Sequence, residues 1–192
     1  MKKIIIIIIV ALTFTACEDK IIDLVIKINE TFDFSADNNG SFTETYTATR
    51  SEIVEDFDYD VSGIEDVNIS FVELLVEPAA GNQATRIRIS GTFSDNTTSP
   101  VFIFQDFELN IDDFTGTAKP ISGYQSAGIN ALAEKLRNYI NETDNSSFTL
   151  QITGVAIDAA GNPVSEAMNF EVSITLDAEV IFEEEASLPS FP

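Results

Sequence analysis

The sequence predicts a mainly β protein, folded as an antiparallel β-sandwich or partial barrel with one or two short helices packed on it. Two long runs, near residues 22–36 and 170–182, alternate between apolar and polar residues. This period of two is typical of strands with one face on a core. Shorter strand patterns lie between them, separated by turn residues and interrupted by a helical pattern. Strands on both sides of an isolated helix favour stacked antiparallel sheets over parallel βαβ units.

The first long run is followed by a turn and a second strand pattern. Its apolar positions share one parity: Ile22, Leu24, Ile26, Ile28, Phe32, Phe34 and Ala36. Residues 37–40, Asp-Asn-Asn-Gly, suit a tight turn because Asn and Gly tolerate positive φ. The Thr-rich run 41–48 then resumes the strand pattern. We therefore expect a hairpin between these two strands.

The segment that follows fits two patterns. Ile53, Phe57 and Val61 occur at a spacing that a strand or one face of a helix would accommodate. Thr49 and Glu52, however, form the pattern of a capping box, in which each residue satisfies a backbone N–H of the other. This pattern favours a short helix from about Arg50 to Asp60.

The middle of the chain returns to strands. The apolar positions change parity between Phe71 and Val72, which indicates a β-bulge. Turn residues at 78–82 and 95–100 separate two further strands, 87–93 and 101–109. Core packing is the expected role of the phenylalanines that share parity with aliphatic residues: Phe32, Phe34, Phe71, Phe170 and Phe182.

A second helix and two strands complete the fold. Ser122 and Gln125 form a capping-box pattern. The apolar residues that follow have the i, i+3, i+4 spacing of a helix face: Ile129, Leu132, Ala133, Leu136 and Ile140. Strands at 148–157 and 164–182 are joined by a loop of turn formers. The last strand mirrors the first in length and pattern, so we expect the two to pair in one sheet.

The beginning of the chain has the layout of a secretory signal. Lys2 and Lys3 precede an apolar run at 4–12, and Thr15 and Ala16 stand directly before Cys17. The apolar run is far shorter than the roughly 20 residues that a membrane-spanning helix needs. The segment resembles the lipobox of bacterial lipoproteins, with Phe14 in place of the usual Leu.

This resemblance implies a specific organisation of the chain. Residues 1–16 would be removed as a signal peptide, and Cys17 would carry the lipid that anchors the protein to a membrane. Residues 17–20 would form a short tether and residues 21–182 a single β-rich domain. Residues 183–192 contain three consecutive Glu and two Pro and are expected to be a flexible tail.

The chain also resembles a loose group of uncharacterised lipoproteins from Bacteroidota-type bacteria. The resemblance rests on the lipobox, the run 51–71 and the closing run 148–182. It implies a place in the cell envelope and a β-rich fold, and no established activity. The acidic Glu18 and Asp19 after Cys17 are similar to signals that send such lipoproteins to the outer membrane and its surface.

Composition excludes several function classes. Without Lys2 and Lys3, the chain has 8 basic and 32 acidic residues, a formal charge of −24. A surface this acidic repels nucleic acid and anionic lipid headgroups. Histidine is absent and Cys17 is the single cysteine, so the His-dependent nucleophiles and usual zinc ligands are missing. No phosphate-binding glycine loop occurs either.

The remaining candidate sites use oxygen ligands. Asp56, Asp58 and Asp60 would line one face and hold calcium, or form a solvated acidic surface. Residues 37–40, and Asp158 with Asn162, resemble fragments of calcium loops, although turn chemistry explains both. No cofactor is otherwise expected. Trp is absent and Tyr is scarce, which argues against an aromatic platform for sugars.

Three functions remain open from sequence alone. The first is a non-catalytic module that binds a protein or glycan of the cell envelope, or supports it structurally. The second is a carrier with an apolar cavity, and the third is a hydrolase that uses paired carboxylates. We favour the first, and expect no enzyme activity, because exposed strands and loops recognise partners without special residues.

Overall fold

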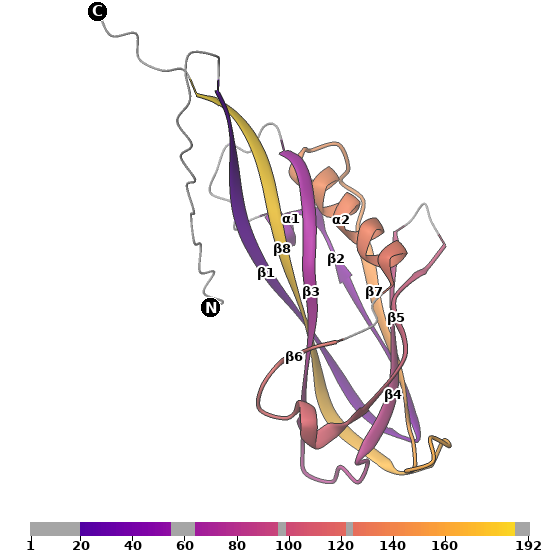
Figure 1. The fold of residues 1–192 in the computed structure, drawn as a ribbon. Helices are drawn as coiled ribbons and strands as arrows, with labels where there is room; N and C mark the ends of the chain where they lie inside the picture. The colour runs from indigo at the N-terminus through magenta and orange to yellow at the C-terminus, as the bar shows by residue number, and fades with distance from the viewer. Residues whose placement is uncertain (1–19, 55–63, 96–98, 122–124, 187–192) are drawn as a thin grey trace, which may run out of the picture.

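The computed structural model describes residues 20–54, 64–95, 99–121 and 125–186 and confirms the predicted β fold. Two four-stranded antiparallel sheets face each other (Figure 1). Sheet A has the order β1 (Lys20–Asn39), β8 (Ala167–Ala186), β3 (Ile64–Pro78), β6 (Lys119–Pro120). Sheet B has the order β2 (Ser41–Ala48), β7 (Phe148–Ala156), β4 (Arg86–Asp95), β5 (Val101–Asn110). Within the described residues neither sheet closes on itself, so the fold is a sandwich.

The strand pairing identifies the sandwich as a jelly roll. β1 pairs with β8, β2 with β7, β3 with β6 and β4 with β5, in every case antiparallel. The chain is therefore one long antiparallel ribbon, with the β4–β5 connection at its tip. Successive segments of the ribbon alternate between the sheets, and the β3–β8 and β4–β7 ladders join them side by side. This is the topology of the eight-stranded jelly roll.

The two long strands pair as predicted, but the predicted hairpin is wrong. β1 and β8 pair along their whole length, from Lys20 opposite Ala186 to Asn39 opposite Ala167. β2 lies in the other sheet, and Gly40 (φ +81°) turns the chain across the core. Its N–H donates to the carbonyl of Glu166 at 3.0 Å, whereas its carbonyl accepts from Ala156 at 2.9 Å. Alternation shows that a strand has a buried face, but carries no information about its partner.

The predicted bulge is present in β3, and it changes the role of Phe71. The register with β8 shifts between Ile69 and Phe71, after an earlier shift between Ile64 and Asp66. Val72, Leu74 and Val76 face the core, while Phe71 is 42% exposed. The prediction that Phe71 packs in the core is therefore wrong, because the bulge moves it to the outer face. Phe32, Phe34 and Phe170 are buried as predicted, and the side chain of Phe182 lies outside the described residues.

The first helix begins where the capping box predicts. α1 (Arg50–Val54) follows Thr49, whose N–H and hydroxyl both donate to Glu52 Oε2 at 2.8 Å. These hydrogen bonds hold the pKa of the Glu52 carboxyl below its ordinary value. The rest of the predicted helix, residues 55–60, lies outside the described residues.

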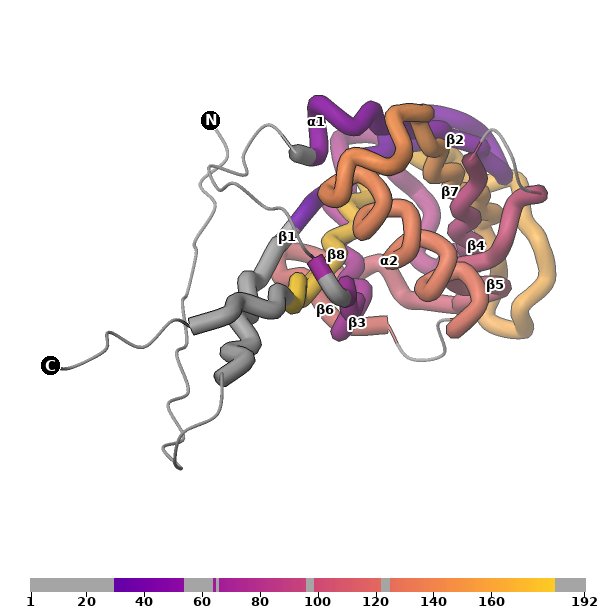
Figure 2. Tube along the Cα trace, turned by 90° about the horizontal axis from the view of Figure 1, so that it is seen from above, coloured from indigo at the N-terminus to yellow at the C-terminus, as the bar shows by residue number. Residues whose placement is uncertain are grey.

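The second helix, α2 (Ser126–Ile140), matches its predicted apolar face. Leu132 and Ile140 are buried, and the helix lies beside β3 and β5, over one end of the gap between the sheets (Figures 1 and 2). The predicted capping box is wrong for Gln125. Gln125 precedes the helix without a side-chain cap, and its Nε2 donates to Gln105 Oε1 at 3.2 Å. Ser122 lies outside the described residues.

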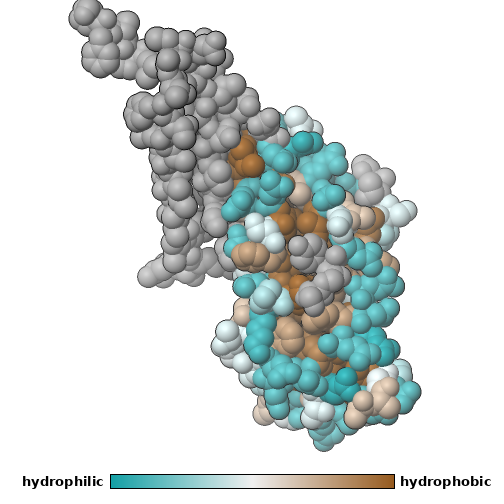
Figure 3. Space-filling view, viewed as in Figure 1, coloured by the Kyte–Doolittle hydropathy of each residue, from teal (hydrophilic) through white to brown (hydrophobic). Residues whose placement is uncertain are grey.

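The core lies between the inner faces of the two sheets. Phe42 of sheet B and Phe170 of sheet A meet edge to face, with ring centroids 5.7 Å apart. Gly154 lies opposite Phe42 on β7, and a Cβ atom at Gly154 would overlap the Phe42 ring. On the side of the molecule seen in Figure 3, apolar residues form a broken band flanked by hydrophilic ones. A short 3-10 helix, η1 (Ile111–Phe114), follows the end of β5 in sheet B and precedes β6 in sheet A.

The last strand begins and ends later than predicted: it starts at Ala167 instead of residue 164 and ends at Ala186 instead of residue 182. β8 continues through Ala186, so residues 183–186, which the sequence assigns to a tail, pair with β1. Pairing with an equally long first strand supports this extension, because each added residue gains a ladder partner.

Candidate functional site

The outer faces of the two sheets differ in charge. On sheet A, seven outward positions carry carboxylates: Asp33, Asp37, Glu73, Glu77, Glu171, Asp177 and Glu179. Other outward positions of this sheet carry Thr31, Ser35, Leu75, Ser173 and Thr175. On β2, β7 and β4 of sheet B, most outward positions carry hydroxyl or amide groups instead; the exceptions are Val155, Arg86 and Arg88. We call the hydroxyl and amide set the hydroxyl face; it consists of Thr43, Thr45, Thr47, Thr149, Gln151, Thr153, Ser90, Thr92 and Ser94. It carries no charge, in a chain with 32 acidic residues. The edge strand β5 adds two exposed carboxylates, Asp106 and Glu108.

Strand alternation produces the hydroxyl face. On β7 the residues Phe148, Leu150 and Ile152 are buried in the core, so the intervening Thr149, Gln151 and Thr153 point outward. β2 and β4 follow the same rule, with exposed Thr on β2 and half-buried Ser and Thr on β4. Thr is favoured in strands because its β-branched side chain fits a pleated surface. That preference explains hydroxyls in general, but it does not explain why no Glu, Asp or Lys occurs among them.

The strand register arranges the hydroxyl face in three rows across the sheet. Thr45, Gln151 and Thr92 form the middle row, because Thr45 lies opposite Gln151 and Thr92 lies opposite Gln151 on the other side. The outer rows are Thr43–Thr153–Ser90 and Thr47–Thr149–Ser94. Neighbouring side chains are therefore separated by roughly 4.8 Å across the strands and roughly 6.6 Å along them. The face is a regular grid of donors and acceptors.

Five of the nine residues of the hydroxyl face make a hydrogen bond within the protein, two of these contacts being at the long limit of 3.5 Å. Gln151 Nε2 donates to Thr45 Oγ1 at 3.5 Å, and the Thr47 and Thr149 hydroxyls are also 3.5 Å apart. The Asp106 N–H donates to Ser90 Oγ at 2.9 Å. Within the described part of the chain, the remaining hydroxyls have no protein partner: Thr43, Thr92, Ser94 and Thr153. Their hydrogen-bonding capacity is available to water or to a ligand.

An exposed aromatic ring borders the hydroxyl face. Phe102 on β5 lies opposite Thr92 and shares its outward side, and its side chain is 37% exposed. The described residues contain one other large apolar side chain with comparable exposure, Phe71 on sheet A. Phe102 thus extends the middle row of the grid with an apolar surface.

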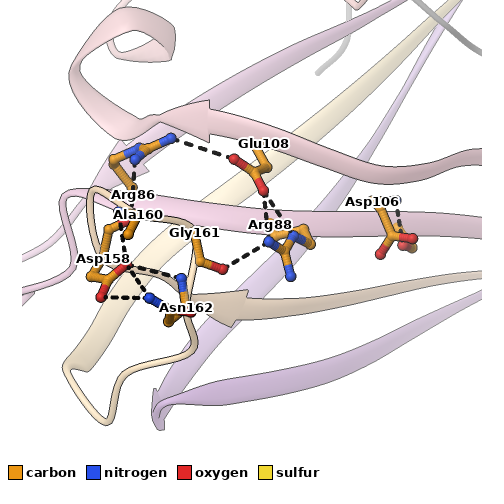
Figure 4. A network of polar contacts seen from close by, with 9 residues as sticks. Arg86, Arg88, Asp106, Glu108, Asp158, Ala160, Gly161 and Asn162 are labelled. Atoms are coloured by element: carbon orange, nitrogen blue, oxygen red, sulfur yellow. Dashed lines mark hydrogen bonds and ion pairs between the residues drawn. The ribbon is translucent and has the colours of Figure 1, made fainter.

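A charged network closes one end of the hydroxyl face (Figure 4). Arg88 donates from Nε and Nη2 to Glu108 Oε1, at 3.1 and 2.6 Å, while Arg86 Nη2 lies 3.4 Å from Glu108 Oε2. The two guanidinium groups also donate to carbonyls of the following loop, those of Asp158 and Gly161. Glu108 contacts both guanidinium groups. Hydrogen bonds within the loop, and then the charge of nearby Arg86, lower the pKa of the Asp158 carboxyl, so two carboxylates lie beside the two arginines. Arg86 Nε is buried and has no hydrogen-bond partner among the described residues.

The loop beside this network uses its polar groups for its own turn. Asp158 Oδ1 accepts hydrogen bonds from the N–H groups of Ala160 at 2.8 Å and Asn162 at 2.9 Å. The backbone and side chain of Asn162 hold the pKa of the Asp158 carboxyl below its ordinary value. This turn chemistry accounts for Asp158 and Asn162. Asp37, Asn38 and Asn39 belong to β1 and pair with β8.

The predicted calcium and lipid sites lie elsewhere in the chain. Among the residues that the structure describes, no group of three or more acidic, His or Cys side chains could hold a metal ion. Asp56, Asp58 and Asp60 lie outside the described residues, as does Cys17, so both sites stay predictions.

A buried cluster that sequence reasoning missed joins α2 to the loop after it. Lys135 is 3% exposed, and its Nζ lies 2.6 Å from Asp144 Oδ2 and 2.7 Å from Ser146 Oγ. Hydrogen bonds from Lys135 and Ser146 lower the pKa of Asp144 to about 2, and burial raises that of Tyr139 to about 12. Asp144 is thus ionised, and its carboxylate is held by Lys135 and Ser146, which is typical of a structural ion pair. No local pattern in the sequence indicates that Lys135 is buried, because lysine on a helix is usually exposed.

The apolar space beside α2 is small. A pocket lined by Phe32, Ile53, Leu136, Phe148 and Leu176, among others, has a volume of about 20 Å³. This is little more than the space for one water molecule, whereas sites for lipid-sized ligands have volumes of several hundred Å³. The pocket therefore gives no support to the carrier hypothesis.

Comparison with known proteins finds no relative by sequence. No protein-family model matches the chain, and no curated protein matches it. The chain is similar to a solved structure of Desmodium yellow mottle tymovirus, with 10% identity, a TM-score of 0.35, and 94% of this chain and 98% of that chain covered. A structure of infectious bursal disease virus, Gx strain, gives 14% identity and a TM-score of 0.34, covering 93% of this chain and 42% of that chain. A structure of the 60-mer BFDV capsid protein gives 12% identity and a TM-score of 0.33, covering 91% of this chain and 98% of that chain. TM-scores this low carry no argument about this chain.

Proposed function

We propose that the protein is an exported lipoprotein of the cell envelope, held by lipid on Cys17, and that it acts as a non-catalytic binding module through its hydroxyl face. The signal and the cysteine at its end support the anchoring. In the residues that the structure describes, no helix is long and apolar enough to cross a membrane.

The observation that carries the binding proposal is the contrast between the carboxylates of sheet A and the uncharged hydroxyl face on β2, β7 and the second half of β4. Carboxylates are spread over sheet A, where they keep the protein soluble and repel other acidic surfaces. The hydroxyl face of sheet B is an uncharged grid whose three rows are fixed by the strand register. Burying an uncharged polar surface avoids the cost of desolvating ions, so a partner can cover this face and exchange its water for hydrogen bonds.

A non-catalytic role agrees with the chemistry of the described polar clusters. Glu108 is held between two arginines, Asp144 is held by Lys135, and Asp158 is held by its own loop. Each of these carboxylates is engaged in a structural contact. A carboxylate-dependent hydrolase needs instead a pair of acids in a cleft, one of which retains its proton.

Site-specific photo-crosslinking in cells that produce the protein tests the proposal. A photoreactive side chain at Thr45, in the centre of the β2 edge of the grid, should give a covalent adduct with the partner. The same side chain at Ser35, an exposed strand position on sheet A, is the matched control and should give none. Adducts at Ser35 alone, or at neither position, would contradict the proposal.

The anchor is tested separately by labelling with radioactive palmitate. Wild-type protein should take up the label and sediment with membranes, whereas Cys17→Ala should do neither. Label retained in Cys17→Ala would show that the lipid is attached elsewhere or that the signal is read differently.

A further inference from the structure

We infer that the ligand of the hydroxyl face is a neutral polysaccharide, which exchanges hydrogen bonds with the grid while one of its sugar rings lies against Phe102. This inference rests on the proposed function and names the ligand class. Three properties of the face select that class: its hydroxyl groups, its lack of charge and the aromatic ring at its border.

The hydroxyl groups match the chemistry of a glycan. A hydroxyl both donates and accepts, and so does the Gln151 amide through its two ends. Sugar hydroxyls have the same dual capacity, so a glycan chain can replace the hydration water of the grid group by group. Thr43, Thr92 and Thr153 have no protein partner within the described part of the chain and are free to make such bonds.

The charge of the surroundings selects a neutral glycan over an acidic one. The chain without its signal has a formal charge of −24, and the carboxylates of sheet A contribute to that field. A uronic acid or a phosphorylated sugar would need a free cation at the face. The two that lie nearest, Arg86 and Arg88, both contact Glu108, and the charge of Arg86 also interacts with the Asp158 carboxylate, so the two positive charges already have two carboxylates beside them (Figure 4).

The composition of the face favours a glycan over a protein partner. Protein interfaces gain most of their binding energy from Trp, Tyr and Arg side chains that fill pockets, while Ser and Thr contribute little. The grid has neither pockets nor such anchors. The sequence expectation against an aromatic platform for sugars counted Trp and Tyr, whereas the structure exposes a phenylalanine, Phe102. A single aromatic ring beside a polar grid suits a sugar ring, whose apolar C–H side packs on the aromatic face while its hydroxyls reach the neighbouring row. The position of Phe102 opposite Thr92 provides this combination.

Affinity electrophoresis of the purified protein tests the inference. The high negative charge gives strong migration in native gels, and a polysaccharide cast into the gel slows a protein that binds it. We would use gels containing dextran, mannan, xylan or β-1,3-glucan as neutral probes, and alginate as the acidic one. Retardation by at least one neutral probe and none by alginate is the expected result. Unchanged migration in all neutral gels, or retardation by alginate alone, would overturn the inference.

Matched variants locate the binding. Phe102→Ala should weaken the retarding interaction about tenfold, and Phe71→Ala, the exposed phenylalanine of sheet A, should leave it unchanged. Thr92→Glu, which introduces a charge beside Phe102, should weaken it at least as much. Unfolding curves of the variants separate loss of binding from loss of fold. Equal effects of Phe102→Ala and Phe71→Ala would contradict a site on the hydroxyl face.

The binding face and its glycan ligand are distinguished by different outcomes. A Thr45 adduct in cells that contains a protein, combined with no retardation by neutral glycans, would remove the glycan inference and leave a binding face. A lack of any Thr45 adduct, with retardation that Thr92→Glu does not change, would remove the hydroxyl face as the binding site.

Discussion

At the scale of single residues, the Lys135–Asp144 ion pair is the contact whose energetics are most asymmetric. The side chain of Lys135 is 3% exposed and that of Asp144 is 29% exposed. Removal of the carboxylate leaves an ammonium group that water does not reach, whereas removal of the ammonium leaves a carboxylate that water partly solvates.

We therefore expect Asp144→Ala to destabilise the protein by about 2–4 kcal/mol, and Lys135→Met by less. Methionine keeps most of the apolar volume of the lysine stem, which limits the second cost. Urea unfolding of both variants measures the difference. A larger loss for Lys135→Met than for Asp144→Ala would contradict the view that the unpaired buried ammonium group is the main cost.

The same pair makes stability depend on pH. The pKa of Asp144 falls from its ordinary value of 3.8 to about 2 in the folded protein. A lowered folded-state pKa contributes stability that is fully present above the unfolded value and is lost as the pH falls from about 4 to about 2. The difference in unfolding free energy between wild type and Asp144→Asn should shrink over this window. A difference that stays constant from pH 5 to pH 2 would contradict the assigned shift.

At the scale of elements, Gly154 of β7 leaves room for the ring of Phe42, which lies opposite it on β2. Gly154→Ala would force a methyl group into the Phe42 ring, which is buried and has little room to move. We expect a loss of about 1–3 kcal/mol, and a smaller loss when Phe42→Leu is already present. Equal losses in both backgrounds would show that the strain lies elsewhere.

The pairing of the two longest strands can be tested by a disulfide. Thr31 of β1 lies opposite Thr175 of β8, and their hydroxyl oxygens are 3.0 Å apart. In a Cys17→Ser background, cysteines at 31 and 175 should cross-link on oxidation. Cysteines at 31 and 47, which the hairpin predicted from sequence would bring together, should not. The reverse pattern would restore the hairpin.

Sequence predicts the elements better than their partners. Alternation locates β1, β4, β5, β7 and β8, since each needs one apolar face, and the i, i+3, i+4 spacing locates α2. It does not reveal that Gly40 carries the chain into the other sheet, because a turn between two strands has the same composition in either case. The sequence also predicts a core position for Phe71, which is exposed. The exact position of the bulge in β3 depends on the register with β8, and an apolar run alone does not reveal it.

The hydroxyl face illustrates the same limit for the site. Its residues alternate visibly in the sequence as Thr43, Thr45 and Thr47, and again as Thr149, Gln151 and Thr153. Only the strand order brings these segments and β4 side by side in one sheet. The paired arginines and the buried Lys135 likewise depend on contacts between distant segments, which no local pattern encodes.

At the scale of the whole molecule, charge repulsion opposes the compact state. The chain carries a formal charge of −22, and carboxylates on sheet A lie on neighbouring strands. Salt screens such exposed charges, with a Debye length of about 10 Å at 0.1 M. We expect the Tm to rise by roughly 2–4 °C, equivalent to about 1 kcal/mol, between low and moderate salt. A Tm that falls with salt would mean that favourable ion pairs outweigh the repulsion.

The central claim is that the envelope partner covers sheet B and leaves sheet A free. Cysteine accessibility in cells tests it most directly, because lipid on Cys17 would block the single native thiol. A cysteine at Thr45 should react with a small maleimide in the purified protein but be protected in cells, whereas a cysteine at Ser35 should react in both. Equal reactivity of the two positions in cells, or protection of Ser35 alone, would contradict the claim that the hydroxyl face is the binding surface.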